Sequence, residues 1–173
     1  GGIGLSDFLG AVACGASRVI TIDITDTKLD KAKEFGATDV FNAKDPNVVE
    51  LVKEATNGGV DYAFETAGVV KAMEVAYAIT KRGGTTVTTG LPHPEHHFSF
   101  PHVSLTAEEK TIKGSYVGSC VPNRDIPRFM QLFRQGRLPV NKLVAKFISL
   151  DEINEGFDLL SKGDYSRIII NKF

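Results

Sequence analysis

Short β-branched runs alternate with segments of helical periodicity along most of the chain, and this alternation limits the folds available to it. The run Arg18–Asp23 precedes a helical pattern at Thr27–Phe35, and Asp39–Asn42 precedes another at Val48–Ala55. A third run, Val60–Glu65, repeats the arrangement. Strands separated by helices of about ten residues need crossover connections, which favour parallel pairing. The sequence therefore predicts an α/β fold with a mostly parallel, doubly wound sheet.

The remaining segments extend this pattern to the C-terminus. Leu91–His102 interrupts it with three prolines and all four histidines, and we predict a loop there that carries a short edge strand, His97–Phe100. The capping-box pattern Ser149–Glu152 predicts the start of the last helix. The other predicted helices are 5–14, 69–77 and 125–135, and the other predicted strands are 85–89, 111–118, 143–148 and 167–171.

No linker or low-complexity segment divides the chain, but its periodicity changes near Gly118. We therefore expect one domain at 1–118 and an associated α/β segment at 119–173.

Composition narrows the classes of partner. The chain has 20 Lys and Arg against 21 Asp and Glu, which excludes the basic footprint of a nucleic-acid or anionic-membrane binder. Two distant cysteines, Cys14 and Cys120, indicate a reducing compartment, with Cys14 expected to be a small buried apolar residue. No apolar run approaches the roughly 20 residues of a membrane span. These features predict a soluble, cytoplasmic protein whose partner is a small molecule or another protein.

A glycine-rich turn followed by an acidic strand end indicates a dinucleotide site. The residues Gly1, Gly2, Ile3 and Gly4 directly before a helix match the second half of the Rossmann fingerprint, although glycines alone also fit an ordinary turn. Asp23 ends a β-branched strand 19 residues after Gly4, close to the spacing of a carboxylate that binds the adenosine ribose. Because such a carboxylate repels a 2′-phosphate, and Ile24 and Thr25 supply no cation, NAD is favoured over NADP.

Longer segments resemble the zinc-type alcohol dehydrogenases of the medium-chain dehydrogenase/reductase superfamily. They follow the family's order: Gly1–Leu5, Asp23 with Lys28–Thr38, Asn57–Glu65, Ile112–Gly114 and Glu152–Leu160. The resemblance implies the NAD-binding portion of such an enzyme, a fragment whose Rossmann-type sheet lacks its first strand. It also implies that 119–173 packs on a catalytic domain outside this sequence. The missing strand would lie between Arg18–Asp23 and Val60–Glu65. We therefore expect that those two strands close on each other, that another segment or a neighbouring chain fills the space, or that the fragment is marginally stable with a disordered glycine turn.

The resemblance also assigns cofactor-binding residues. Gly1, Gly2, Ile3 and Gly4 would hold the pyrophosphate with Arg167, while Asp23 and Lys28 would flank the adenosine ribose. The nicotinamide would lie against Thr66, Gly90, Leu91, Ser115 and Val117.

In that family, hydride passes between an alcohol carbon and the nicotinamide while zinc stabilises the alkoxide. The family's catalytic zinc ligands, two cysteines and a histidine, precede the segment matched here, so we expect no catalytic residue, no metal and no dehydrogenase activity in these 173 residues alone. The cluster His93, His96, His97 and His102 lacks regular ligand spacing and is interpreted as a polar loop.

Two other functions remain open at this point. One is a zinc-free quinone or enoyl reductase fragment, which Asp23 disfavours because such enzymes usually prefer NADP. The other is a non-catalytic nucleotide-binding fragment. The resemblance to the zinc-type alcohol dehydrogenases also implies a homodimer or larger homo-oligomer, with Phe98–Phe100 on the edge strand that pairs between copies.

Overall fold

The computed structural model describes residues 1–163 and 165–173, and these form two compact units. One unit contains Gly1–Thr21, Thr25–Val40 and Val121–Phe173, and the other contains Ile22–Ile24 and Phe41–Cys120. We call them unit 1 and unit 2.

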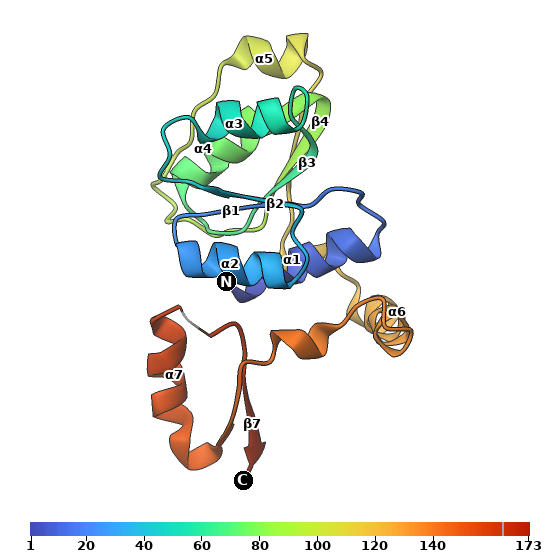
Figure 1. Cartoon of the computed structure of the whole chain (residues 1–173), viewed down its shortest axis with the longest axis vertical. Coiled ribbons are helices and arrows are strands. Elements are labelled where there is room, and N and C mark those ends of the chain that lie inside the picture. Colours follow the sequence, from blue (N-terminus) through green and yellow to red (C-terminus); the bar gives the residue numbers. More distant parts are fainter. Residues whose placement is uncertain (164) are drawn as a thin grey trace. The chain divides into compact units, whose positions relative to one another are not determined.

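Helices and strands alternate as the sequence predicts (Figure 1). The helices are α1 (Gly2–Ala13), α2 (Asp26–Glu34), α3 (Val48–Ala55), α4 (Val70–Ile79), α5 (His102–Ala107), α6 (Pro122–Arg134) and α7 (Ile153–Ser161). The strands are β1 (Ile20–Asp23), β2 (Asp39–Asn42), β3 (Val60–Glu65), β4 (Thr80–Thr88), β5 (Thr111–Gly114), β6 (Lys146–Ser149) and β7 (Ile168–Lys172). Short 3-10 helices occur at η1 (Val117–Ser119), η2 (Val140–Leu143) and η3 (Leu150–Glu152).

Unit 2 is built on the three-stranded sheet β3-β4-β5, in which both pairs are parallel. Helix α4 packs on β3 and β4, and α3 packs beside α4 (Figure 1). The inner faces of these helices are buried, through Val52 of α3 and through Met73 and Tyr77 of α4. Two buried hydroxyls, Thr80 and Thr86, lie 2.8 Å apart and satisfy each other, so the polar atoms inside this layer keep a partner.

Unit 1 has its core where α1 meets η2. Phe8 and Leu9 of α1 are buried against Leu138 and Leu143. In the same unit, α7 packs on the parallel pair β6-β7. A side chain at Gly156 of α7 would lie 2.8 Å from the Ile148 Cδ1, so the glycine permits this close packing. The predicted capping box is confirmed, since Ser149 and Glu152 exchange both of its hydrogen bonds.

Parallel strands joined through helices confirm the predicted α/β class. The described strands fall into three separate sheets, β1-β2, β3-β4-β5 and β6-β7. Thus β1 and β3 do not close on each other, which was one of the three expected outcomes for the edges beside the missing strand.

The prediction of an edge strand at His97–Phe100 is wrong, because the structure has no strand between Leu91 and Phe100. Prolines at 92, 94 and 101 remove backbone donors from this segment. Its aromatic side chains pack instead: the rings of Phe98 and Phe100 stack at 5.6 Å, and Phe100 lies 4.9 Å from the ring of Tyr77.

Other differences are smaller. Cys14 was expected to be buried but is exposed, since it caps the C-terminal end of α1. The strand predicted at 111–118 ends at Gly114, because residues 117–119 turn through positive φ angles. The strand predicted at 143–148 begins only at Lys146, after η2. Helix α5 was not predicted, as its six residues lack an apolar face of useful length.

Candidate functional site

The carboxyl ends of β3, β4 and β5 meet at one edge of unit 2. Glu65 of β3 lies opposite Thr88 of β4, and Thr88 lies opposite Gly114 of β5. The residues predicted to contact the nicotinamide lie in the loops that follow these positions: Thr66, Gly90, Leu91, Ser115 and Val117. Parallel pairing therefore brings these five residues, which are distant in sequence, to one edge, where open α/β sheets bind ligands.

The loops after β3 and β4 approach each other backbone to backbone. A Cβ on Gly90 would collide with the backbone nitrogen and Cα of Gly68, and would lie 2.7 Å from the Glu65 Oε2. Gly68 itself has a φ of 68°, and a Cβ there would lie 3.1 Å from the Leu91 nitrogen. Glycine is therefore required on both sides of this contact.

Glu65 is buried, at 4% exposure, beneath this contact. Its Oε1 accepts hydrogen bonds from the backbone amides of Ala67 and Gly68, both at 2.7 Å. Its Oε2 accepts the Thr88 hydroxyl at 2.9 Å. We did not single out Glu65 from the sequence. A charged residue directly after the apolar run Tyr62–Phe64, at the end of a parallel strand, was the available signal.

The side chains of other residues predicted at this edge are more exposed to solvent than that of Glu65. Leu91 is 78% exposed and Val117 is 70% exposed. Ser115 donates its amide to the Thr88 carbonyl oxygen at 2.9 Å, and its hydroxyl lies 3.2 Å from that of Ser119. Val117 has a φ of 50°, a left-handed conformation that is costly for a β-branched residue. The edge therefore offers exposed backbone and small side chains.

In unit 1 the glycine turn forms the N-terminus of α1. Gly1 is the N-cap, and its carbonyl oxygen accepts the Leu5 amide at 3.0 Å. The first amides of a helix have no intrahelical acceptor and carry the positive end of its dipole. Gly2, Ile3 and Gly4 supply these amides, and Ile3 is 53% exposed.

Arg167 lies against this turn. A Cβ on Gly2 would collide with the Arg167 Nη1 and would lie 2.5 Å from the Ser166 carbonyl oxygen. The same Nη1 donates to that carbonyl oxygen at 3.0 Å, which fixes the guanidinium beside the helix end. A fixed cation next to helix amides favours an anion with several oxygens, and two residues 165 positions apart create this environment.

The predicted ribose-binding residues have different environments. Asp23 is the last residue of β1, is partly buried, and its carbonyl oxygen accepts the Ala43 amide at 3.0 Å. Lys28, in the first turn of α2, places its Nζ 3.6 Å from a Cβ built on Gly163. Each unit therefore holds part of the predicted residue set.

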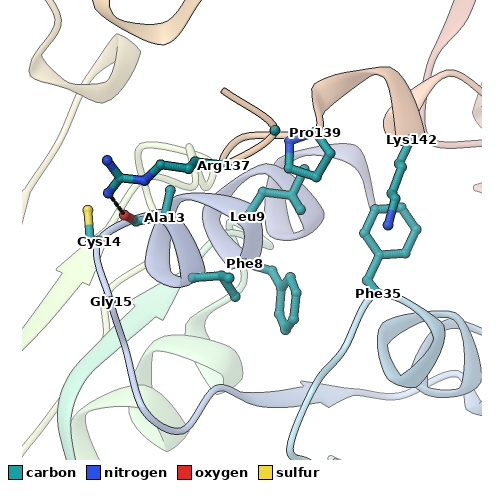
Figure 2. Close-up of a pocket in the computed structure, with 11 residues that line it drawn as sticks. Phe8, Leu9, Ala13, Cys14, Gly15, Phe35, Arg137, Pro139 and Lys142 are labelled. Carbon is teal, nitrogen blue, oxygen red and sulfur yellow. Dashed lines mark hydrogen bonds between the residues drawn. The ribbon is translucent and has the colours of Figure 1, made fainter. Parts of the chain in front are cut away.

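A cavity of unit 1 lies elsewhere, along α1 (Figure 2). It has a volume of about 490 Å³, with Phe8 and Leu9 on one side and Pro139 across from them. Arg137 donates to the Ala13 carbonyl oxygen at 3.2 Å at one end. None of the predicted cofactor residues lines this cavity.

Asp7, also on α1, has a carboxylate oxygen, Oδ2, that is buried without a hydrogen-bond partner among the residues described. Burial raises the pKa of the Asp7 carboxyl above its usual value, because the charged form loses hydration.

The four histidines occupy the loop before α5 and the start of that helix. The ring centres of His93 and His96 lie 5.6 Å apart, with the ring planes tilted by 54°. Among residues 1–163 and 165–173, no group of three or more His, Cys, Asp or Glu side chains could hold a metal ion. In the same residues, no helix has both the length and the apolar character to cross a bilayer.

Known proteins resemble the chain along nearly its whole length. Residues 2–135 match the family model described as zinc-binding dehydrogenase. Alcohol dehydrogenase 1 of Cenchrus americanus is 37% identical over 173 residues, which cover 98% of this chain and 45% of the relative, and alcohol dehydrogenase 2 of Zea mays is 38% identical with the same coverage.

Solved structures of dehydrogenases also resemble the chain along nearly its whole length. Benzyl alcohol dehydrogenase from Acinetobacter calcoaceticus superposes with a TM-score of 0.93 at 35% identity, over 99% of this chain and 47% of that one. The 2R,3R-butanediol dehydrogenase from Bacillus subtilis gives a TM-score of 0.88 at 30% identity, over 100% and 49%. The chain spans about half the length of these relatives. Since the family model covers most of its residues, the chain belongs to the zinc-binding dehydrogenase family.

Proposed function

We propose that this chain is the NAD-binding portion of an alcohol dehydrogenase that transfers hydride between an alcohol or aldehyde and the nicotinamide. The observation that carries the proposal is the Arg167 guanidinium fixed beside Gly2 at the N-terminus of α1. The names of its relatives support the reaction class.

The helix end fits a pyrophosphate. The Cβ position of Gly2 is already filled by Arg167 and the Ser166 carbonyl, so only glycine leaves the α1 amides open to phosphate oxygens. The amides of Gly2, Ile3 and Gly4 would donate to one phosphate while Arg167 offsets its charge.

The adenosine ribose and the nicotinamide would be held by different kinds of groups. The Asp23 carboxylate would accept both adenosine ribose hydroxyls, with Lys28 beside them, and would repel a 2′-phosphate. At the edge of unit 2, Thr66, Gly90, Leu91, Ser115 and Val117 would hold the nicotinamide through backbone groups and small side chains. When bound, NAD accepts the hydride. The chain's own residues bind and orient it.

Zinc does not fit the described residues, because no set of suitable ligands converges in them. No step through a metal is therefore derived for this chain. We propose that residues 1–118 bind the coenzyme, that 119–173 associates with a catalytic domain, and that the protein acts in the cytoplasm.

We also propose that the protein forms a homodimer through the segment that contains Phe98 and Phe100. Both rings are partly exposed and stack on each other, which leaves an apolar surface for a second copy. Sedimentation of Phe98→Lys should show a smaller species than the parent, and an unchanged mass would contradict this interface.

Titration of the chain with NAD and NADP by calorimetry tests the cofactor assignment. NAD should bind more tightly, and Asp23→Ala should weaken NAD binding about tenfold or more, since two hydrogen bonds to a charged group are lost. Asp30→Ala, on the exposed face of α2, is the matched control and should leave both affinities unchanged. Equal or tighter binding of NADP by the parent would contradict the proposal.

A further inference from the structure

We propose that Glu65 is a positioning residue whose buried carboxylate ties the loops after β3 and β4 into one unit and so fixes the backbone that meets the nicotinamide. This inference rests on the proposed function and deepens it. The two loops are 66–69, which contains Thr66, and 89–91, which contains Gly90 and Leu91.

The side chain of Glu65 joins both loops. Its Oε1 holds the first loop through the amides of Ala67 and Gly68, while its Oε2 holds β4 through the Thr88 hydroxyl. The three donors are two backbone amides and one hydroxyl, all neutral. A carboxylate that is 4% exposed and held by such donors binds them more strongly than an amide would, because charge-assisted hydrogen bonds are about twice as strong as neutral ones.

The backbone of Glu65 reinforces the same connection. Its carbonyl oxygen accepts the amides of Thr89 at 2.9 Å and Gly90 at 3.4 Å. The Thr89 hydroxyl donates to it at 3.3 Å. One residue thus binds the first loop and the end of β4 through its carboxylate, and the second loop through its carbonyl oxygen.

The two loops meet at glycines, so no side chain packs between them. Gly68 and Gly90 touch through backbone atoms only, and Gly68 also lies against Leu91. Backbone-to-backbone contact without side chains gives little packing energy. The hydrogen bonds of Glu65 therefore set the separation of the two loops.

A ligand that binds across both loops gains from this arrangement. Loops held in the bound geometry lose less conformational freedom on binding, which improves affinity without any new contact. The benefit should apply to the nicotinamide half of NAD and not to its adenine half, since the loops in question are those that would hold the nicotinamide.

The experiment compares NAD with ADP-ribose, which lacks the nicotinamide, in calorimetric titrations of the 173-residue chain. Glu65→Ala should weaken the binding of NAD about tenfold or more, while the affinity for ADP-ribose should change less than about twofold. Glu65→Gln should restore most of the NAD affinity, because its carbonyl can still accept from Ala67 and Gly68 and the Thr88 hydroxyl can turn to accept. Thr88→Val should fall between the two, and Glu95→Ala, exposed in the following loop, is the control.

Amide NMR shifts supply a second measurement. In the parent, the Ala67 and Gly68 amide protons should resonate far downfield, and Glu65→Gln should move both upfield as the acceptor loses its charge. This readout holds even where Glu65→Ala does not fold.

If Glu65→Ala weakens the binding of NAD and of ADP-ribose equally, the positioning role is overturned. Parental NAD affinity in Glu65→Ala would overturn it as well. If Glu65→Ala does not fold, the same test applies to Thr88→Val. Equal affinity of the parent for NAD and ADP-ribose would overturn it too. Failure of the proposed function is distinct: neither ligand would bind to the parent or to Glu95→Ala, while the amide shifts would still report the hydrogen bonds.

Discussion

A methyl group on Gly90 should separate the two loops at the edge of unit 2. The Cβ of Gly90→Ala would overlap the Gly68 backbone and lie 2.7 Å from the Glu65 Oε2, where ordinary contacts need about 3.5 Å or more. Neither neighbour is the flexible end of a side chain, since the backbone is fixed by β3 and β4 and the carboxylate by its three donors. Relief therefore requires movement of a loop.

The cost follows from two losses. Overpacking of this kind costs about 1–3 kcal/mol. Moving the second loop away also breaks the hydrogen bonds that the Thr89 and Gly90 amides donate to the Glu65 carbonyl oxygen, and such neutral bonds contribute about 0.5–1.5 kcal/mol each. Gly90→Ala should therefore destabilise unit 2 by roughly 2–6 kcal/mol, a large part of an ordinary domain's stability.

Urea unfolding followed by tyrosine fluorescence measures this loss, because Tyr62, Tyr77 and Tyr116 all lie in unit 2. Gly114→Ala is the matched control: it also lies at a strand end of the same sheet, has no positive φ, and its Cβ would meet no atom within 4 Å. A difference of less than about 0.5 kcal/mol between the two variants, within the range of ordinary surface substitutions, would refute the steric reasoning.

Two further predictions concern α1. Gly10→Ala should stabilise the chain by about 0.5–1 kcal/mol and raise the midpoint of thermal unfolding by a few degrees, because alanine loses less backbone entropy and its Cβ would meet no atom within 4 Å; a lower midpoint by circular dichroism would contradict this. Asp7→Asn should stabilise the chain at pH 7, since the raised pKa of Asp7 means that the parent loses stability as pH rises above the unfolded value near 3.8. The advantage should vanish below that pH in urea titrations at pH 3 and pH 7, and an equal advantage at both would exclude ionisation of Asp7 as its cause.

The sequence alone predicted the fold class and most elements of unit 2. The run Val60–Glu65 and the strand Asp39–Asn42 were predicted with the bounds observed. Local signals were sufficient because β-branched runs, glycine stops and capping residues act within a few positions of the chain. The same signals failed at His97–Phe100, where an alternating apolar pattern had no strand beside it with which to pair.

Tertiary structure decided which distant residues meet. Arg167 on its own resembles any arginine at a sheet edge, and only the fold places it against Gly2. The position of Glu65 at a strand end was a local signal, but its role was not visible in the sequence, because its partners come from the following loop and from a strand 23 positions away. Sequence periodicity specifies which face of an element is apolar, but the register between elements determines which polar atoms find each other, and that register exists only once the chain has folded.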